Sequence, residues 1–185
     1  MRSPNTGIVE SVSLSPVHGF SKQPQLSILL IAGEGVEGDA HRGRTVQHLY
    51  FKRKKPGTPN HSQVHLFAAE MLDELRTLGF DLAAGDLGEN ILTRGLDLLT
   101  LPTGTRLHLG AQAVVELTGL RTPCSQVDDF RKGLQQHLWG ERGDDGKKSR
   151  RAGVMSIVLH GGPVHPRDEI RIELPARPHT PLQPV

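Results

Sequence analysis

The sequence has little of what several common classes of protein depend on. Its 185 residues include one cysteine, which excludes an internal disulfide and the disulfide scaffolds of small secreted proteins. Aromatic residues make up 4% of the chain and the net charge is +2. These values give neither a base-stacking surface nor the electrostatic footprint of a nucleic-acid-binding protein. We therefore expect a protein of a reducing compartment with no nucleic-acid partner.

Long apolar segments are missing as well. The first ten residues contain no stretch of signal-peptide length, and the longest apolar run, around residues 28–32, is too short to cross a bilayer. The sequence thus predicts a cytoplasmic protein with no membrane partner. The basic run at 52–55, in the segment 52–61, is interpreted as a solvated loop whose role stays open.

Turn-forming residues and short apolar segments dominate the rest of the chain. The 21 glycines and 13 prolines favour many short elements joined by tight turns. Without regular alternation of strands and helices, this pattern predicts a mainly β fold with a few helices and a β-barrel-like core. A single domain is expected over residues 1–185, with a disordered Pro-rich tail from about residue 175. Strands are predicted at 7–14, 25–32, 88–93, 105–109, 112–119, 153–159 and 169–174, the second of them buried throughout.

Two helices are expected. In the first, Phe67, Met71, Leu75 and Leu78 follow a helical period, and Gly79 occupies the position of a C-terminal cap. The second begins directly after the cysteine, with apolar residues at 127, 130, 134 and 138 and an N-cap signature at 125–128. The segment 141–152 is expected to be a mobile charged loop.

Two tempting motifs are rejected. Residues 33–38, GEGVEG, have the dinucleotide-binding spacing, but no helical period follows them and no acidic residue for a ribose occurs before Glu70. A glycine-rich turn explains the segment better. The ten histidines are scattered, and His61 and His65, four residues apart, follow a proline and an asparagine that disfavour a helix. A zinc site is therefore not predicted.

Cys124 is the strongest candidate for a functional residue. A lone cysteine is often a small buried apolar side chain. This one lies in RTPCS, between a strand and a predicted helix, where the helix dipole and Arg121 favour the thiolate while Asp128 and Asp129 oppose it. A thiolate can act as a nucleophile or as a ligand of a soft metal, and the residues alone do not choose between these roles.

Two further polar clusters flank predicted strands, at 38–44 (GDAHRGR) and 85–90 (GDLGEN). Either they converge on Cys124 or their Asp and Asn side chains cap local turns. In order along the chain, the segments GDAHRG, RTVQH, QVHLF, GDLGENILTRGLDL, GTRLHLG, ELTGLRTPC and AGVMSIVLHGG resemble the MOSC domain family, named for the C-terminal domain of molybdenum cofactor sulfurases. The resemblance covers nearly the whole chain outside the termini and is closest to the short, stand-alone bacterial type.

The resemblance implies a β-barrel that holds the molybdenum cofactor, molybdopterin. In members related to the amidoxime reducing component a cysteine ligates molybdenum, a role that falls here to Cys124. The other implied cofactor-binding residues are Arg44, His48 and Arg121 for the pterin phosphate, Glu89 and Asn90 for the pterin ring, and His41 in the first polar cluster. Arginine suits phosphate because its fork binds two oxygens.

Three functions remain open on this resemblance. The chain is the catalytic subunit of a reductase of N-hydroxylated compounds, a carrier that holds sulfur as a Cys124 persulfide or delivers cofactor, or a metal-free thiol or binding protein. As a reductase it would need a small-molecule substrate and an external electron-donor protein, since it has no ferredoxin-like cysteine cluster. It lacks the aminotransferase-like domain of full-length sulfurases, so no pyridoxal phosphate site is expected.

Overall fold

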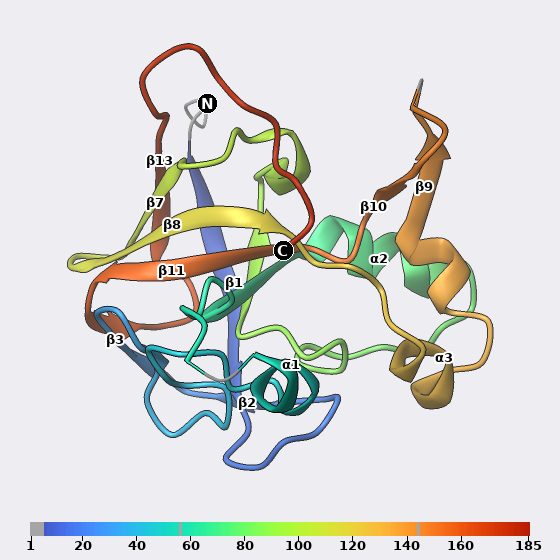
Figure 1. Ribbon diagram of the computed structural model, residues 1–185, viewed down its shortest axis with the longest axis horizontal. Helices are drawn as coiled ribbons and strands as arrows, with labels where there is room; N and C mark the ends of the chain where they lie inside the picture. The colour runs from blue at the N-terminus through green and yellow to red at the C-terminus, as the bar shows by residue number, and fades with distance from the viewer. Residues whose placement is uncertain (1–5, 56, 144) are drawn as a thin grey trace.

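The computed structural model describes residues 6–55, 57–143 and 145–185. Within these ranges seven strands close into a barrel, in the order β13, β7, β8, β11, β5, β6, β1, and β1 pairs again with β13 (Figure 1). The expected mainly β, barrel-like fold is therefore confirmed. The barrel strands are β1 (Thr6–Leu14), β5 (Val64–Ala68), β6 (Ile91–Arg94), β7 (Arg106–Leu109), β8 (Ala113–Leu120), β11 (Val154–His160) and β13 (Glu169–Glu173).

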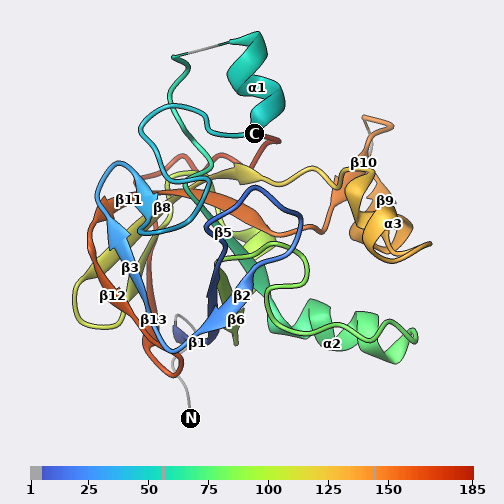
Figure 2. The same cartoon turned by 90° about the horizontal axis from the view of Figure 1, so that it is seen from below.

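Smaller elements surround the barrel. β2 (Gln23–Gln25) extends the sheet beside β1, while β3 (Ile28–Ile31), β4 (Gly35–Val36) and β12 (Gly162–Val164) form a separate sheet. β9 (Trp139–Arg142) and β10 (Lys148–Arg150) form a hairpin that projects from the body (Figures 1 and 2). The helical segments are α1 (Leu49–Lys54), α2 (Ala69–Thr77), α3 (Gln126–Phe130) and the 3₁₀ turns Leu98–Thr100 and Gln135–Leu138. None of the described helices is long and apolar enough to span a membrane.

The barrel interior is filled by the inward faces of its strands. Ala113, Val115 and Leu117 of β8 alternate with outward residues and join the main apolar cluster. This alternation follows from the two-residue period of a strand. A second apolar cluster lies outside the barrel, where α2 and the segment 127–138 cover β5 and β6. One side of the barrel is therefore covered by helical segments.

The first predicted helix is confirmed with a later start. Phe67 belongs to β5, and α2 begins at Ala69. Met71 and Leu75 are buried against the barrel, whereas Leu78 is exposed at the end of the helix. Gly79 has a φ of +94° and follows the C-cap residue, as its sequence position predicted.

The second predicted helix is wrong as a continuous element. α3 ends after five residues because Arg131 is extended and Gly133 adopts a left-handed φ of +83°. Val127, Leu134 and Leu138 are nevertheless buried. Their helical spacing arises because two short helical turns pack against the same apolar cluster. Ser125 forms no capping hydrogen bond, and the Asp128 carboxylate instead accepts one from the Gln135 amide at 2.7 Å.

Several segments also differ from expectation. The predicted buried strand at 25–32 is broken, because Leu26 is 93% exposed and only residues 28–31 form β3. The predicted loop at 141–152 contains most of the β9–β10 hairpin, apart from residue 144, which lies outside the described residues. The basic run at 52–55, predicted to be a loop, instead forms the last turn of α1 through residue 54, with exposed side chains. Residue 56 is likewise not described.

The C-terminal tail, expected to be disordered from about residue 175, lies against the barrel instead. Pro181 forms an isolated bridge with Pro102, and the backbone of Gln183 accepts a hydrogen bond from the Leu120 amide at 2.8 Å. Leu182 is 5% exposed and belongs to the main core. Proline-rich composition alone did not report this packing, because the buried anchor is a single leucine.

Candidate functional site

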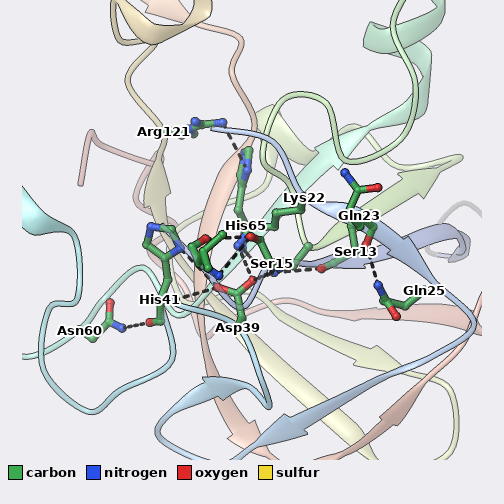
Figure 3. A network of polar contacts seen from close by, with 12 residues as sticks. Ser13, Ser15, Lys22, Gln23, Gln25, Asp39, His41, Asn60, His65 and Arg121 are labelled. Carbon is green, nitrogen blue, oxygen red and sulfur yellow. Dashed lines mark hydrogen bonds and ion pairs between the residues drawn. The ribbon is translucent and has the colours of Figure 1, made fainter. Parts of the chain in front are cut away.

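Polar side chains from distant parts of the chain meet at one end of the barrel. They come from the loop before β2, the loop after β4, the start of β5, the turn before β6 and the residue directly after β8. We call this group the polar cluster; Figure 3 shows much of it. Its members are Lys22, Asp39, His65, Glu89, Asn90 and Arg121.

Asp39 is the centre of the part of the cluster that also contains Lys22 and Asn90. Its buried carboxylate pairs with the Lys22 ammonium and accepts hydrogen bonds from the backbone amides of Ser15 at 3.2 Å and His41 at 2.9 Å. Burial raises the pKa of Asp39, but the hydrogen bond from His41 and the charge of Lys22 outweigh burial and hold that pKa well below its usual range. The carboxylate is therefore a fixed negative charge.

Asn90 joins three segments of the chain. Its side-chain NH₂ donates to the Ser13 carbonyl at 3.1 Å and to Asp39 at 3.2 Å, and its side-chain oxygen accepts from the His65 amide at 3.2 Å. An asparagine amide has two donor hydrogens, and both are used here inside the protein. The expectation that Asn90 binds a pterin ring is therefore not supported; its role is to tie β1 and β5 together.

His65 links Asn90, and through it Asp39, to Arg121. Burial lowers the pKa of His65 far below its usual value, and the charge of Arg121 lowers it further, so the ring is neutral. Its Nε2 lies 2.8 Å from the Ala152 carbonyl and must donate, which leaves Nδ1 as an acceptor for the Arg121 Nη1 at 3.5 Å. In Figure 3 His65 lies between Arg121 and the Lys22–Asp39 pair.

Arg121, directly after β8, is held in one orientation. Its Nη1 donates to the Leu87 carbonyl as well as to His65, and its guanidinium lies 5.8 Å from the ring centre of Phe20. These contacts use Nη1 only, so the Nε and Nη2 edge keeps donor hydrogens for a planar or tetrahedral anion. The expectation that Arg121 faces a cofactor phosphate stays a prediction, for which these donors are available.

The GDLGEN turn brings the Lys22 loop close to Arg121 because two of its glycines leave room for the backbone. A Cβ on Gly85 would lie 2.3 Å from the Lys22 carbonyl, and one on Gly88 would lie 2.4 Å from the Phe20 carbonyl. Both glycines also have positive φ, near +87° and +80°. The motif is thus a close-packed turn that presents Glu89 to the cluster.

Glu89 is the least satisfied residue of the cluster. It is 1% exposed; one carboxyl oxygen accepts from the Gly85 amide, and the other has no hydrogen-bond partner. Burial raises the pKa of Glu89 to about 7, although the Gly85 amide and Arg121 act in the opposite direction. An orphaned, deeply buried oxygen beside two cations marks the place where a bound group would supply a partner.

Cys124 follows Arg121 by three residues and is partly buried. Its Sγ lies 3.6 Å from the Gln126 side-chain oxygen, and its segment is fixed by Arg150, whose Nε donates to the Thr122 hydroxyl at 2.9 Å. Cys124 interacts electrostatically with Arg121, the residue that the sequence analysis placed beside it. The expected helix dipole contributes little, because α3 has only five residues.

The remaining predicted residues lie at the edge. His41 is 3.3 Å from Asp39, and its ring is 5.0 Å from that of His18. His48 is exposed; partial desolvation lowers its pKa, and the charges of His41 and Arg121 lower it further. Arg44 is 81% exposed and pairs with Glu34 at 3.5 Å, so the structure does not bring it into the cluster.

Lys22 and His65 are central residues that the sequence reasoning missed. Lys22 lies in GFSKQ, a loop with no recognised motif, and the sequence marks His65 only as a histidine four residues after His61 and as part of QVHLF. The alternation in QVHLF could have placed His65 on one face of a strand, but its contacts with residues 90, 121 and 152 are tertiary. Among the described residues no group of three or more His, Cys, Asp and Glu side chains could hold a metal ion.

Two surface clefts lie away from this cluster. One, of about 570 Å³, separates the β9–β10 hairpin from the turn at 97–100, and the other, of about 310 Å³, lies beside β7 and the residues after β13. Neither is lined by Cys124 or by a member of the polar cluster. The chemistry of the cluster and not the size of a cleft therefore identifies the candidate site.

The chain is similar to proteins of known structure. The family model described as MOSC domain matches residues 40–171. The structure of YuaD from Bacillus subtilis is 22% identical with a TM-score of 0.75, over 92% of this chain and 97% of that one. YiiM from Escherichia coli is 18% identical with a TM-score of 0.61, over 95% and 73%. YiiM from Geobacillus stearothermophilus is 17% identical with a TM-score of 0.56, over 91% and 73%. These identities indicate a shared fold, and no curated protein matches the chain.

Proposed function

Because this chain belongs to the MOSC domain family, whose members are associated with the molybdenum cofactor, we propose that it binds that cofactor with Cys124 as the molybdenum ligand. The observation that carries the proposal is the electrostatic interaction of a partly buried thiol with an oriented guanidinium three residues before it. A soft thiolate suits molybdenum, and the arginine suits a phosphate.

The cluster fits such a group in charge and in hydrogen bonding. Lys22 and Arg121 outnumber the fixed carboxylate of Asp39, so an anionic ligand balances the charge. The orphaned oxygen of Glu89 is available to an N–H or O–H donor of the ligand. Of the residues first expected to bind the cofactor, Cys124, Arg121 and Glu89 keep that proposed role, with His41 and His48 at the edge.

The residues of this chain would hold and orient the cofactor. His65 contacts the guanidinium of Arg121 through its Nδ1, and Arg150 holds the segment that carries Cys124 by its hydrogen bond to Thr122. When bound, the cofactor supplies oxygen-atom transfer coupled to two-electron redox chemistry, which the protein's own side chains do not perform. We therefore propose a reductase of N-hydroxylated small molecules that takes its electrons from a partner protein.

Cofactor content tests the proposal. The wild-type protein and the variant Cys124→Ala are purified from a host that makes the cofactor, and molybdenum and pterin are measured per chain. Ser125→Ala is the matched control, because Ser125 is adjacent and forms no capping hydrogen bond. We expect molybdenum in the wild type and the control and its loss in Cys124→Ala.

Other outcomes identify the alternatives. Equal molybdenum in Cys124→Ala and the wild type would refute the ligand assignment. No molybdenum or pterin in the wild type, together with a persulfide on Cys124 by mass spectrometry, would favour the sulfur carrier instead. Arg121→Met should lower the pterin content more than it lowers the free energy of unfolding, since we propose that the arginine binds the phosphate.

A further inference from the structure

Glu89 lies where its charge acts on both cations of the polar cluster. The residue follows Leu87 and Gly88 in the turn that receives the guanidinium of Arg121. Its carboxyl group interacts electrostatically with Arg121 and with Lys22, and it is 99% removed from solvent. Because screening by water is weak at such depth, one unit of charge on Glu89 changes the local potential strongly.

We propose that Glu89 sets the anion affinity of the cluster: with a neutral carboxyl group the site holds an anion tightly, and with a carboxylate it releases the anion. This inference rests on the proposed role of Arg121 in binding an anionic group. It assigns Glu89 a charge-setting role beyond contact with a pterin ring.

The charge count of the cluster supports the proposal. Lys22 and Arg121 are positive, Asp39 is a fixed negative charge, and His65 is neutral. With Glu89 neutral the cluster carries one surplus positive charge, and with Glu89 ionised it carries none. Asp86, in the same turn, is a further charged group that acts on Glu89 and raises its pKa.

The unpartnered carboxyl oxygen of Glu89 favours its neutral form. The neutral form leaves a buried oxygen without a partner, which costs less than leaving a buried carboxylate half satisfied. The pKa of about 7 places the change of state near neutral pH. By linkage, an anion bound at Arg121 favours the protonated form of Glu89, and protonation of Glu89 favours the anion equally.

Sulfate binding to the cofactor-free protein tests this inference. Sulfate keeps the same charge between pH 5.5 and 8.5, so any change in its affinity comes from the protein. Titration calorimetry would give the dissociation constant at both values for the wild type and for Glu89→Gln, which is isosteric and cannot ionise. Glu70→Gln, which removes an exposed carboxylate from α2, is the matched control, and Arg121→Met shows whether the sulfate binds at the cluster.

We expect Glu89→Gln to bind sulfate about tenfold more tightly than the wild type at pH 8.5, and equally at pH 5.5, which corresponds to a coupling of about one pKa unit. Comparison of the two proteins at equal pH removes the contributions of all other groups. Glu70→Gln should match the wild type at both values, and Arg121→Met should lose binding at both.

Equal affinities of Glu89→Gln and wild type at pH 8.5 would overturn the inference. Undetectable sulfate binding by the wild type, or unchanged binding by Arg121→Met, would overturn it too. Because sulfate binding requires no molybdenum, these results are independent of the cofactor measurement with Cys124→Ala. Circular dichroism of each variant checks that the fold is retained.

Discussion

Two groups of charged side chains in this barrel form similar ion pairs in opposite surroundings. On the surface, Arg94 of β6 pairs with Glu10 and, at 2.8 Å, with Asp73, and its side chain is 33% exposed. In the polar cluster, Lys22 and Asp39 pair at 6% and 2% exposure. Water solvates and screens the surface network, whereas each charge of the buried pair is compensated mainly by the opposite charge of its partner. The comparison teaches that burial, and not the number of ion pairs, distinguishes the candidate site.

The largest effect is expected from breaking the buried pair. Asp39→Asn leaves the Lys22 ammonium without a counter-charge and should lower the free energy of unfolding at pH 7 by about 3–5 kcal/mol. Urea denaturation measures this change. The double variant Lys22→Met with Asp39→Asn removes the uncompensated charge and should recover part of the loss. A cost below about 1 kcal/mol in the single variant would contradict the comparison.

A smaller effect is expected from Glu89 as a dependence on pH. Its folded-state pKa of about 7 is above the unfolded value of 4.5, so folding favours the protonated carboxyl group. The resulting stability is present below pH 4.5 and is lost as the pH rises through 7, by about 3 kcal/mol in total. Glu89→Gln should not show this loss. Parallel curves of unfolding free energy against pH for variant and wild type would refute the buried, titrating carboxyl group.

The smallest effect is expected at the surface network. Arg94→Met should change the free energy of unfolding by no more than about 1 kcal/mol, because the charges of Glu10 and Asp73 remain solvated. The difference between variant and wild type should shrink further in 0.5 M salt, as screening predicts. A loss as large as that of Asp39→Asn, or one that salt does not reduce, would remove the contrast between the two regions.

Local patterns predicted the fold well where one face of an element meets one core. The predicted strand at 105–109 corresponds to β7, and Gly79 ends α2 as expected. The predicted strand at 25–32 failed because Leu26 and Leu29 are apolar residues that the fold leaves at the surface. The predicted helix after Cys124 failed because Gly133 provides a left-handed turn between two buried segments, which an apolar period does not reveal.

The site was predictable only in part, because some of its residues meet only through tertiary contacts. Arg121, Cys124 and Glu89 lie in motifs that carry a family resemblance, and MOSC family membership is confirmed by the match over residues 40–171. Lys22 and Asp39 lie outside that range, and their pairing spans a sequence separation that no local spacing reports. The Asn90 side chain is taken up by backbone groups of β1 and β5, a role that belongs to the fold.

The metal environment tests the central assignment most directly. Wild-type protein and Cys124→Ser, both loaded with cofactor in vitro, would be compared by X-ray absorption at the molybdenum edge. If Cys124 is the ligand, the wild type has one more sulfur neighbour around molybdenum than the serine variant has. An identical sulfur shell in the two proteins would contradict the assignment, whatever their molybdenum content.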